Sequence, residues 1–138
     1  MPMRKAILIG CLIFLASGCK KTIEKIKENA IISAMTDGQW VITNFVKNGA
    51  VITSDFSGYK FQYYKDRTVD AFKNGIVEKK GTWDGDPNAM TVSANFSNVV
   101  TPLSLINGTW HIDDNSWTYV VASLNSGTES MKMKLEKL

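Results

Sequence analysis

Histidine and cysteine are scarce in this chain, which contains one histidine and two cysteines among 138 residues. The single histidine, His111, cannot build a zinc site unless several carboxylates join it, because zinc sites rely on clusters of imidazole and thiolate ligands. His111 and Asp113 have the composition of part of a catalytic relay, but no Gly-x-Ser-x-Gly elbow accompanies them. The sequence therefore predicts a surface histidine and a protein that is not an enzyme.

Motifs for phosphate, calcium and nucleic acid are also missing. No glycine pattern of the Walker or Rossmann kind occurs. The run Asp84-Gly85-Asp86-Pro87-Asn88 begins like a calcium loop, but Ala89 stands where that loop needs glycine and Asn95 where it needs glutamate, which favours a hairpin turn. A formal net charge of +3 gives no electrostatic case for nucleic acid binding. We expect neither a metal nor another cofactor.

Residues 1–18 have the features of a bacterial export signal. A short positive region and an apolar run from Ala6 to Ala16 precede the small residues Ser17 and Gly18, and then comes Cys19. Such an arrangement is typical of a secretory signal and is too short for a helix that spans a membrane. An ordinary signal cut near Gly18, with Cys19 incidental, is the alternative.

The ending Ala16-Ser17-Gly18-Cys19 resembles the lipobox of bacterial lipoproteins, although the usual leucine sits one place early, at Leu15. In that family the cysteine is acylated and becomes the first residue of the mature protein. The resemblance therefore implies a lipid anchor at Cys19, where two or more acyl chains suffice for stable attachment to a membrane. It also implies that residues 1–18 are a cleaved signal peptide.

Maturation would change both the cysteine content and the charge of the chain. Cys11 would leave with the leader, so Cys19 would be the only cysteine and no intramolecular disulfide could form. Cleavage removes two of the 16 basic side chains and none of the 13 acidic ones, which leaves a net charge of about +1. The pair Lys20-Lys21 differs from the acidic pattern that accompanies surface export in some bacterial lipoproteins. We expect an anchor in the cell envelope, on the outer membrane and facing the periplasm.

Residues 20–35 have the pattern of a helix within a connecting segment, 19–37. Thr22 can cap this helix, and apolar residues recur on one of its faces. The helix could pack on the following domain or form an amphipathic spacer near the lipid, and a partly helical tether is the alternative. The recurring apolar residues are Ile23, Ile26, Ala30 and Ile31.

From Trp40 onward, short runs of alternating apolar residues are separated by turn residues, as in an all-β meander. Asn48-Gly49 and Asn74-Gly75 are strong hairpin signals, because both central residues of a type I′ turn need positive φ. The stretch 99–106 breaks the rhythm and is expected to be a loop or one helical turn. The expected strands are 39–47, 58–65, 67–73, 76–84, 89–96, 107–113, 116–123 and 129–136.

Period-two alternation gives these strands one apolar face. Eight consecutive antiparallel strands with one apolar face can close into a barrel, which removes their exposed edges. A two-sheet sandwich is the alternative. The residues expected to point inward are Trp40, Ile42, Tyr59, Phe61, Tyr63, Val69, Ala71, Met90, Val92, Ala94, Phe96, Trp110, Ile112, Trp117, Tyr119, Val121, Met131, Met133 and Leu135.

Gly38-Gln39-Trp40 matches the Gly-x-Trp signature of lipocalins, in which the tryptophan closes one end of the barrel. Together with the runs 57–61, 81–83 and 105–110, it makes residues 38–138 resemble the lipocalin-like lipoproteins of Bacteroidetes. The resemblance implies an all-β, eight-stranded antiparallel up-and-down barrel in the cell envelope. Two marks of typical lipocalins are absent, a Thr-Asp-Tyr motif and a late arginine that would stack on the first tryptophan.

The large rings on the expected inward face point to a binding role. Eight-stranded barrels have the size at which side chains either fill the interior or leave room for one small ligand. We expect a membrane-anchored module that holds a small apolar or amphipathic molecule, and the alternative is a filled barrel whose loops or outer surface bind another envelope protein. Lys79 shares the face of Trp83 and would meet an anionic head group unless a strand bulge turns it outward. The expected ligand site is formed by Phe61, Tyr63, Lys79, Trp110, Trp117 and Tyr119.

Overall fold

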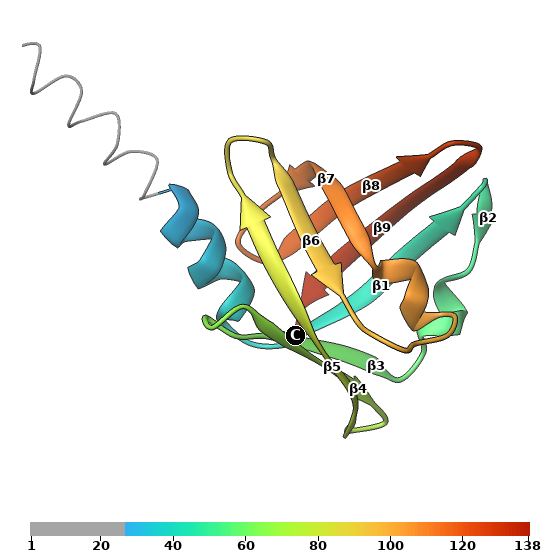
Figure 1. Cartoon of the computed structure of the whole chain (residues 1–138), viewed down its shortest axis with the longest axis horizontal. Coiled ribbons are helices and arrows are strands. Elements are labelled where there is room, and N and C mark those ends of the chain that lie inside the picture. Colours follow the sequence, from blue (N-terminus) through green and yellow to red (C-terminus); the bar gives the residue numbers. More distant parts are fainter. Residues whose placement is uncertain (1–26) are drawn as a thin grey trace, which may run out of the picture.

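The computed structural model describes residues 27–138, so the predicted signal peptide, Cys19 and the first part of the predicted helix lie outside the described residues. Within residues 27–138, no helix is long and apolar enough to cross a membrane. A helix over 27–36 comes first. It is followed by β1 (Trp40–Lys47), β2 (Ala50–Val51), η1 (Thr53–Phe56), β3 (Tyr59–Tyr63), β4 (Thr68–Lys73), β5 (Ile76–Asp86), β6 (Thr91–Asn95), η2 (Leu103–Ile106), β7 (Gly108–Asn115), β8 (Tyr119–Ser126) and β9 (Glu129–Lys137) (Figure 1).

The long strands follow one another around a closed antiparallel barrel. Each strand from β3 to β9 pairs with the next, and β9 pairs back on β1 between Trp40–Lys137 and Lys47–Met131. The pairing of β1 with β3 is at Trp40 and Phe61, and farther along β1 pairs with the short β2. The predicted eight-stranded barrel with a preceding helix is therefore confirmed, and the sandwich alternative is wrong. The two-residue strand β2 was not among the predicted strands.

The turn chemistry explains why the strand bounds could be predicted to within three residues. Asn48 and Gly49 have φ values of 51° and 81°, and Asn74 and Gly75 have 51° and 82°, as a type I′ hairpin requires. The irregular stretch 99–106 contains the short helix η2, as expected. The turns β3–β4, β5–β6 and β7–β8 gather at the end of the barrel beside helix 27–36, opposite the β1–β2 hairpin (Figure 1).

A single apolar core fills the barrel. The side chains of Trp40, Phe45, Phe61 and Trp110 are at most 1% exposed. Phe45 lies edge-on to Trp110, with ring centroids 5.9 Å apart, and stacks on Phe56 of η1 at 4.8 Å. Aromatic rings bury large areas and gain from such stacked and edge-to-face contacts. Interlocked rings from β1, η1 and β7 therefore stabilise the barrel from within.

Strand β8 faces the opposite way from the sequence prediction. Trp117 is 54% exposed, and Tyr119 lies on the outer face because it pairs with the outward-facing Glu136. Both alternating sets of side chains in this strand contain apolar residues, so alternation alone could not choose between the two faces. Pairing with β9 decides the phase, because Val120 and Ala122 lie opposite the buried Leu135 and Met133. A slip of one residue moves every side chain of a strand to the other face.

Three further residues predicted to point inward are not in the buried core. Met90 has a φ of 53°, belongs to the β5–β6 turn and is 41% exposed. Ala94 is only half-buried, and Val121 lies on the outer face of β8 with Tyr119. For Met90 the error came from starting a strand two residues early, inside the turn that reverses the chain.

Candidate functional site

The residues predicted to form an interior ligand site divide between the two faces of the barrel. Phe61, Tyr63 and Trp110 are buried in the core, and burial raises the pKa of the Tyr63 hydroxyl. Trp117 and Tyr119 lie outside, so the structure does not bring the predicted set together. The prediction that both rings line the interior is wrong, because the phase of β8 is reversed.

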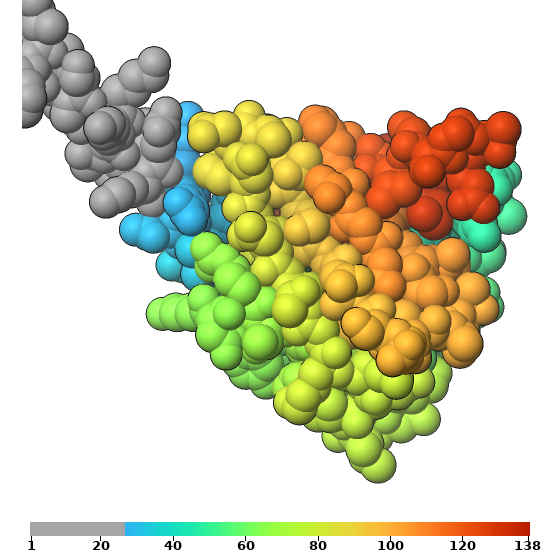
Figure 2. Space-filling model, viewed as in Figure 1, coloured from blue at the N-terminus to red at the C-terminus, as the bar shows by residue number. Residues whose placement is uncertain are grey.

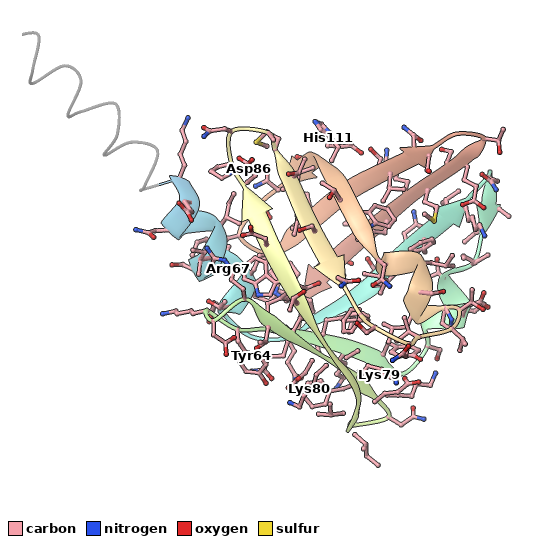
Figure 3. The ribbon with its side chains drawn as sticks, in the orientation of Figure 1. Tyr64, Arg67, Lys79, Lys80, Asp86 and His111 are labelled. Atoms are coloured by element: carbon pink, nitrogen blue, oxygen red, sulfur yellow. The ribbon has the colours of Figure 1, made fainter. Side chains whose placement is uncertain are left out.

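Lys79 stays on the inner face of β5. It pairs with the buried Ala71, and the register shifts only beyond it, where Phe72 pairs with Val77. A bulge is present, but it lies one residue nearer the hairpin tip, so it does not turn Lys79 outward. Lys79 is half-buried near the end of the barrel that carries the β4–β5 hairpin (Figure 3).

The end of the barrel beside helix 27–36 is closed by a lysine between two tryptophans. The Nζ atom of Lys137 lies 5.2 Å from the ring centroid of Trp40 and 5.0 Å from that of Trp117. It also lies 3.4 Å from a carboxylate oxygen of Asp37, and the Lys137 side chain is only 10% exposed. Lys137 thus places a cation over the first tryptophan of the barrel. Lys137 was not predicted, because only an arginine was expected to stack on the first tryptophan.

Helix 27–36 is docked over this end by one buried hydrogen bond and close packing. The indole N–H of Trp40 donates to the backbone carbonyl of Met35 at 2.9 Å. A side chain at Gly85 would lie within 2.8 Å of Ile31, so glycine lets β5 approach the helix. Arg67 lies 3.3 Å from Glu28 of the helix and 3.2 Å from Asp84 of β5. Exposed ion pairs of this kind stabilise a fold only slightly, so the apolar contacts hold the helix.

A small apolar cavity remains beneath the helix. Its volume is about 40 Å³. An apolar cavity that holds benzene has a volume of roughly 150 Å³, so this one has no room for a ring or an acyl chain as it stands. It is lined by Ile31, Ala34, Met35, Trp40, Val92, Ile112, Asn115, Ser116 and Val120.

The outer wall of the barrel contains a buried carboxylate that the sequence analysis did not single out. Asp70 on β4 is 6% exposed, although it alternates with the inward-facing Val69 and Ala71. Its two carboxylate oxygens accept hydrogen bonds from the Tyr64 hydroxyl at 2.9 Å and from Lys80 Nζ at 3.0 Å. Tyr64 and Lys80 lie on the same flank of the barrel (Figure 3). No sequence signal marks Asp70, because the strand pattern places it on the solvent side.

His111 is exposed on β7, as predicted, and its contacts differ in order from those of a Ser-His-Asp relay. Its Nδ1 lies 3.0 Å from a carboxylate oxygen of Asp113, and that same oxygen accepts a hydrogen bond from the Ser123 hydroxyl at 3.1 Å. A relay would need the hydroxyl to contact the imidazole. The hydrogen bond from His111 lowers the pKa of the Asp113 carboxyl. Among residues 27–138, no group of three metal-ligating side chains is placed to hold an ion.

No known protein-family model matches this chain, and no curated protein matches it. Its structure is similar to the crystal structure of a DUF4847 family protein from Bacteroides vulgatus ATCC 8482, with a TM-score of 0.51 and 13% sequence identity. The similarity covers 75% of this chain and 95% of that one. At this identity the likeness supports the lipocalin-like barrel fold and carries no statement about activity.

Proposed function

We propose that this protein is a lipid-anchored, lipocalin-like module of the cell envelope that binds another envelope component through the loops and outer surface of a filled barrel. The observation that carries the proposal is the packing of the interior. Four rings that are at most 1% exposed, Trp40, Phe45, Phe61 and Trp110, occupy the space in which a lipocalin would hold its ligand. Protein interiors are close-packed, so an interior ligand would have to displace one of these rings.

The anchoring part of the proposal is supported by the leader sequence. A lipid on Cys19 would hold the barrel near the membrane, because only seven residues separate Cys19 from Lys27, the first described residue. An extended chain spans at most about 3.6 Å per residue, so the helix would lie within roughly 30 Å of the acylated cysteine. This geometry would leave the outer wall and the far loops free for a partner.

Titration with fatty acids and apolar fluorescent probes, followed by tryptophan emission, tests the binding mode. A filled barrel should give a flat titration. Saturable binding of one molecule for each chain would contradict the proposal and would indicate that the protein binds its ligand inside the barrel.

A second candidate function is binding of a small apolar or amphipathic molecule within the barrel, and one observation favours it. The cavity beneath helix 27–36 is apolar, and a displacement of the helix would enlarge it. Ala34→Phe would fill the cavity from the helix side and should abolish such binding. If a ligand binds the unmodified protein and binds Ala34→Phe equally well, this cavity is not its site.

A further inference from the structure

We propose that the outer wall carries a groove that binds a neutral, polyhydroxylated ligand such as an oligosaccharide chain. This inference rests on the proposed function, because it names the chemistry of the envelope component that the outer surface recognises. The outer wall contains two open depressions of about 340 and 350 Å³. The first is lined by Tyr64, Asp66, Thr68, Asp70, Lys80 and Gly81, and the second by Thr82, Trp83, Asp84, Ser93, Ala94, Asn95, Gly108 and Thr109.

The two depressions adjoin at one cross-strand pair. Thr68 of the first lies directly opposite Thr82 of the second in the β4–β5 ladder. Thr82 in turn lies opposite Asn95, and Asp84 lies opposite Ser93 on β6. Strands in a sheet are about 4.8 Å apart, so these side chains form regular rows across the wall. We call the combined surface the outer groove. Figure 2 shows, from outside, the wall formed by β5, β6 and β7, which contains part of this groove.

The polar groups at the β3–β5 end of the outer groove are held in place before any ligand arrives. Asp66 accepts hydrogen bonds from the backbone N–H of Thr68 at 2.9 Å and from the Thr68 hydroxyl at 2.6 Å. Asp70 is fixed by Tyr64 and Lys80. A carboxylate offers about four lone-pair sites, so the exposed Asp66 keeps acceptors for additional donors, whereas the buried Asp70 holds Tyr64 and Lys80 in position. Binding would therefore order few side chains, which reduces its entropic cost.

The charge of the outer groove disfavours an anionic ligand. Asp66, Asp70 and Asp84 contribute three carboxylates, against one lysine that already binds Asp70. Arg67, at its rim, is paired with Glu28 and Asp84. A phosphate or an acidic polymer would meet net negative charge here. No ring of ligands for a metal ion exists among the described residues.

The composition of the outer groove also differs from that of a protein interface. Interface centres are enriched in aromatic residues, methionine and arginine and are depleted of serine, aspartate and lysine. Here the exposed groups are mostly short side chains, namely hydroxyls and an amide that both donate and accept hydrogen bonds and carboxylates that accept them. The half-buried ring of Tyr64 adds an apolar surface for the C–H faces of a sugar. These groups together match a neutral ligand with many hydroxyls.

A panel of neutral oligosaccharides, tested against the purified protein by saturation-transfer NMR and calorimetry, examines the proposal. We expect at least one neutral glycan to bind and acidic glycans and inorganic phosphate not to bind. Tyr64→Ala removes the apolar ring surface, and Ser93→Arg blocks the groove with a long side chain. Each should weaken binding at least about tenfold. Lys134→Ala, on the outer face of β9, is the matched control and should bind like the unmodified protein. Circular dichroism and thermal melting establish that each variant is folded.

Three results would contradict the proposal that the outer groove binds a neutral oligosaccharide. They are no binding across the neutral panel, binding restricted to acidic glycans, and neutral binding that is unchanged in both Tyr64→Ala and Ser93→Arg. A result that rejects the groove proposal differs from one that rejects the proposed function. The proposed function is rejected when fatty acids or apolar probes bind inside the barrel. Binding of that kind would be insensitive to Ser93→Arg, whose side chain lies on the outer wall.

Discussion

The ammonium group of Lys137 lies between the rings of Trp40 and Trp117, 5.2 Å from the first centroid and 5.0 Å from the second. Trp40 begins the first strand, and Lys137 ends the last one directly opposite it in the β1–β9 ladder. This contact therefore joins the two strands whose pairing closes the barrel. It also gives the exposed Trp117 a structural role at the helix-covered end.

We predict that Lys137→Ala lowers the free energy of unfolding by about 1–2 kcal/mol, because partly desolvated cation–π contacts have this strength. Lys137→Arg should retain most of the stability, since arginine also stacks on aromatic faces. Chemical denaturation followed by tryptophan emission measures both changes. Lys134→Ala, which removes the cation over Tyr119 on the outer face, is the control. Equal stability of Lys137→Ala and the unmodified protein would show that the contact has no energetic role.

The neighbouring residues Val120 and Val121 provide a matched test of the strand phase in β8. Val120 is buried opposite Leu135, and Val121 faces outward. Val120→Ser leaves a gap and a buried hydroxyl, so we expect it to lower the free energy of unfolding by about 2–3 kcal/mol. Val121→Ser should cost less than about 1 kcal/mol, as is usual for substitutions outside the core. Denaturant melts measure both losses. A larger loss in Val121→Ser than in Val120→Ser would show that Val121 faces inward, as predicted from the sequence.

Tyr59 should make the stability of the fold depend on alkaline pH. Burial, together with a hydrogen bond to Glu78, raises the pKa of its hydroxyl from 10.0 to about 12. A raised pKa in the folded state means that the contribution to stability is complete below pH 10 and is lost as the pH rises from 10 to 12. Tyr59→Phe should flatten this part of the pH–stability curve. Titration of the tyrosinate absorbance checks the pKa directly, and an ordinary value for Tyr59 contradicts the prediction.

The anchor can be tested with the two cysteines of the chain as a matched pair. Cys19→Ala should abolish metabolic labelling with fatty acid and should move the protein out of the detergent phase, because the thiol that carries the lipid is gone. Cys11 lies in the predicted leader, so Cys11→Ala should leave both the fatty-acid labelling and the partition into detergent unchanged. Labelling that persists in Cys19→Ala would place the lipid elsewhere or exclude it.

Local signals in the sequence were sufficient to predict most of the barrel. Asn48-Gly49 and Asn74-Gly75 located two hairpins, because few residues tolerate positive φ. In β9 the alternation is unambiguous, since the buried Met131 and Met133 alternate with lysines and with Glu136. The strand bounds and the inner face of this strand followed from such short-range patterns.

The errors and omissions have a common physical origin in contacts between strands, which the pattern within one strand does not reveal. The phase of β8 depends on its register with β9, which alternation within β8 could not decide. Lys137 and Trp40 are brought together only by barrel closure. Asp70 alternates with core residues as an exposed residue would, and only Tyr64 and Lys80 from neighbouring positions cover it. The candidate site was therefore less predictable than the fold.

Native mass spectrometry of the purified protein tests most directly whether the barrel is filled. The packing of Trp40, Phe45, Phe61 and Trp110 predicts that no apolar molecule is bound non-covalently, so the mass should equal that of the polypeptide with any covalent modification it carries. The contrary result would be a lipid or metabolite present in one copy for each chain and released when the protein unfolds. Such a molecule would show that the interior opens to hold a ligand and that the function lies inside the barrel.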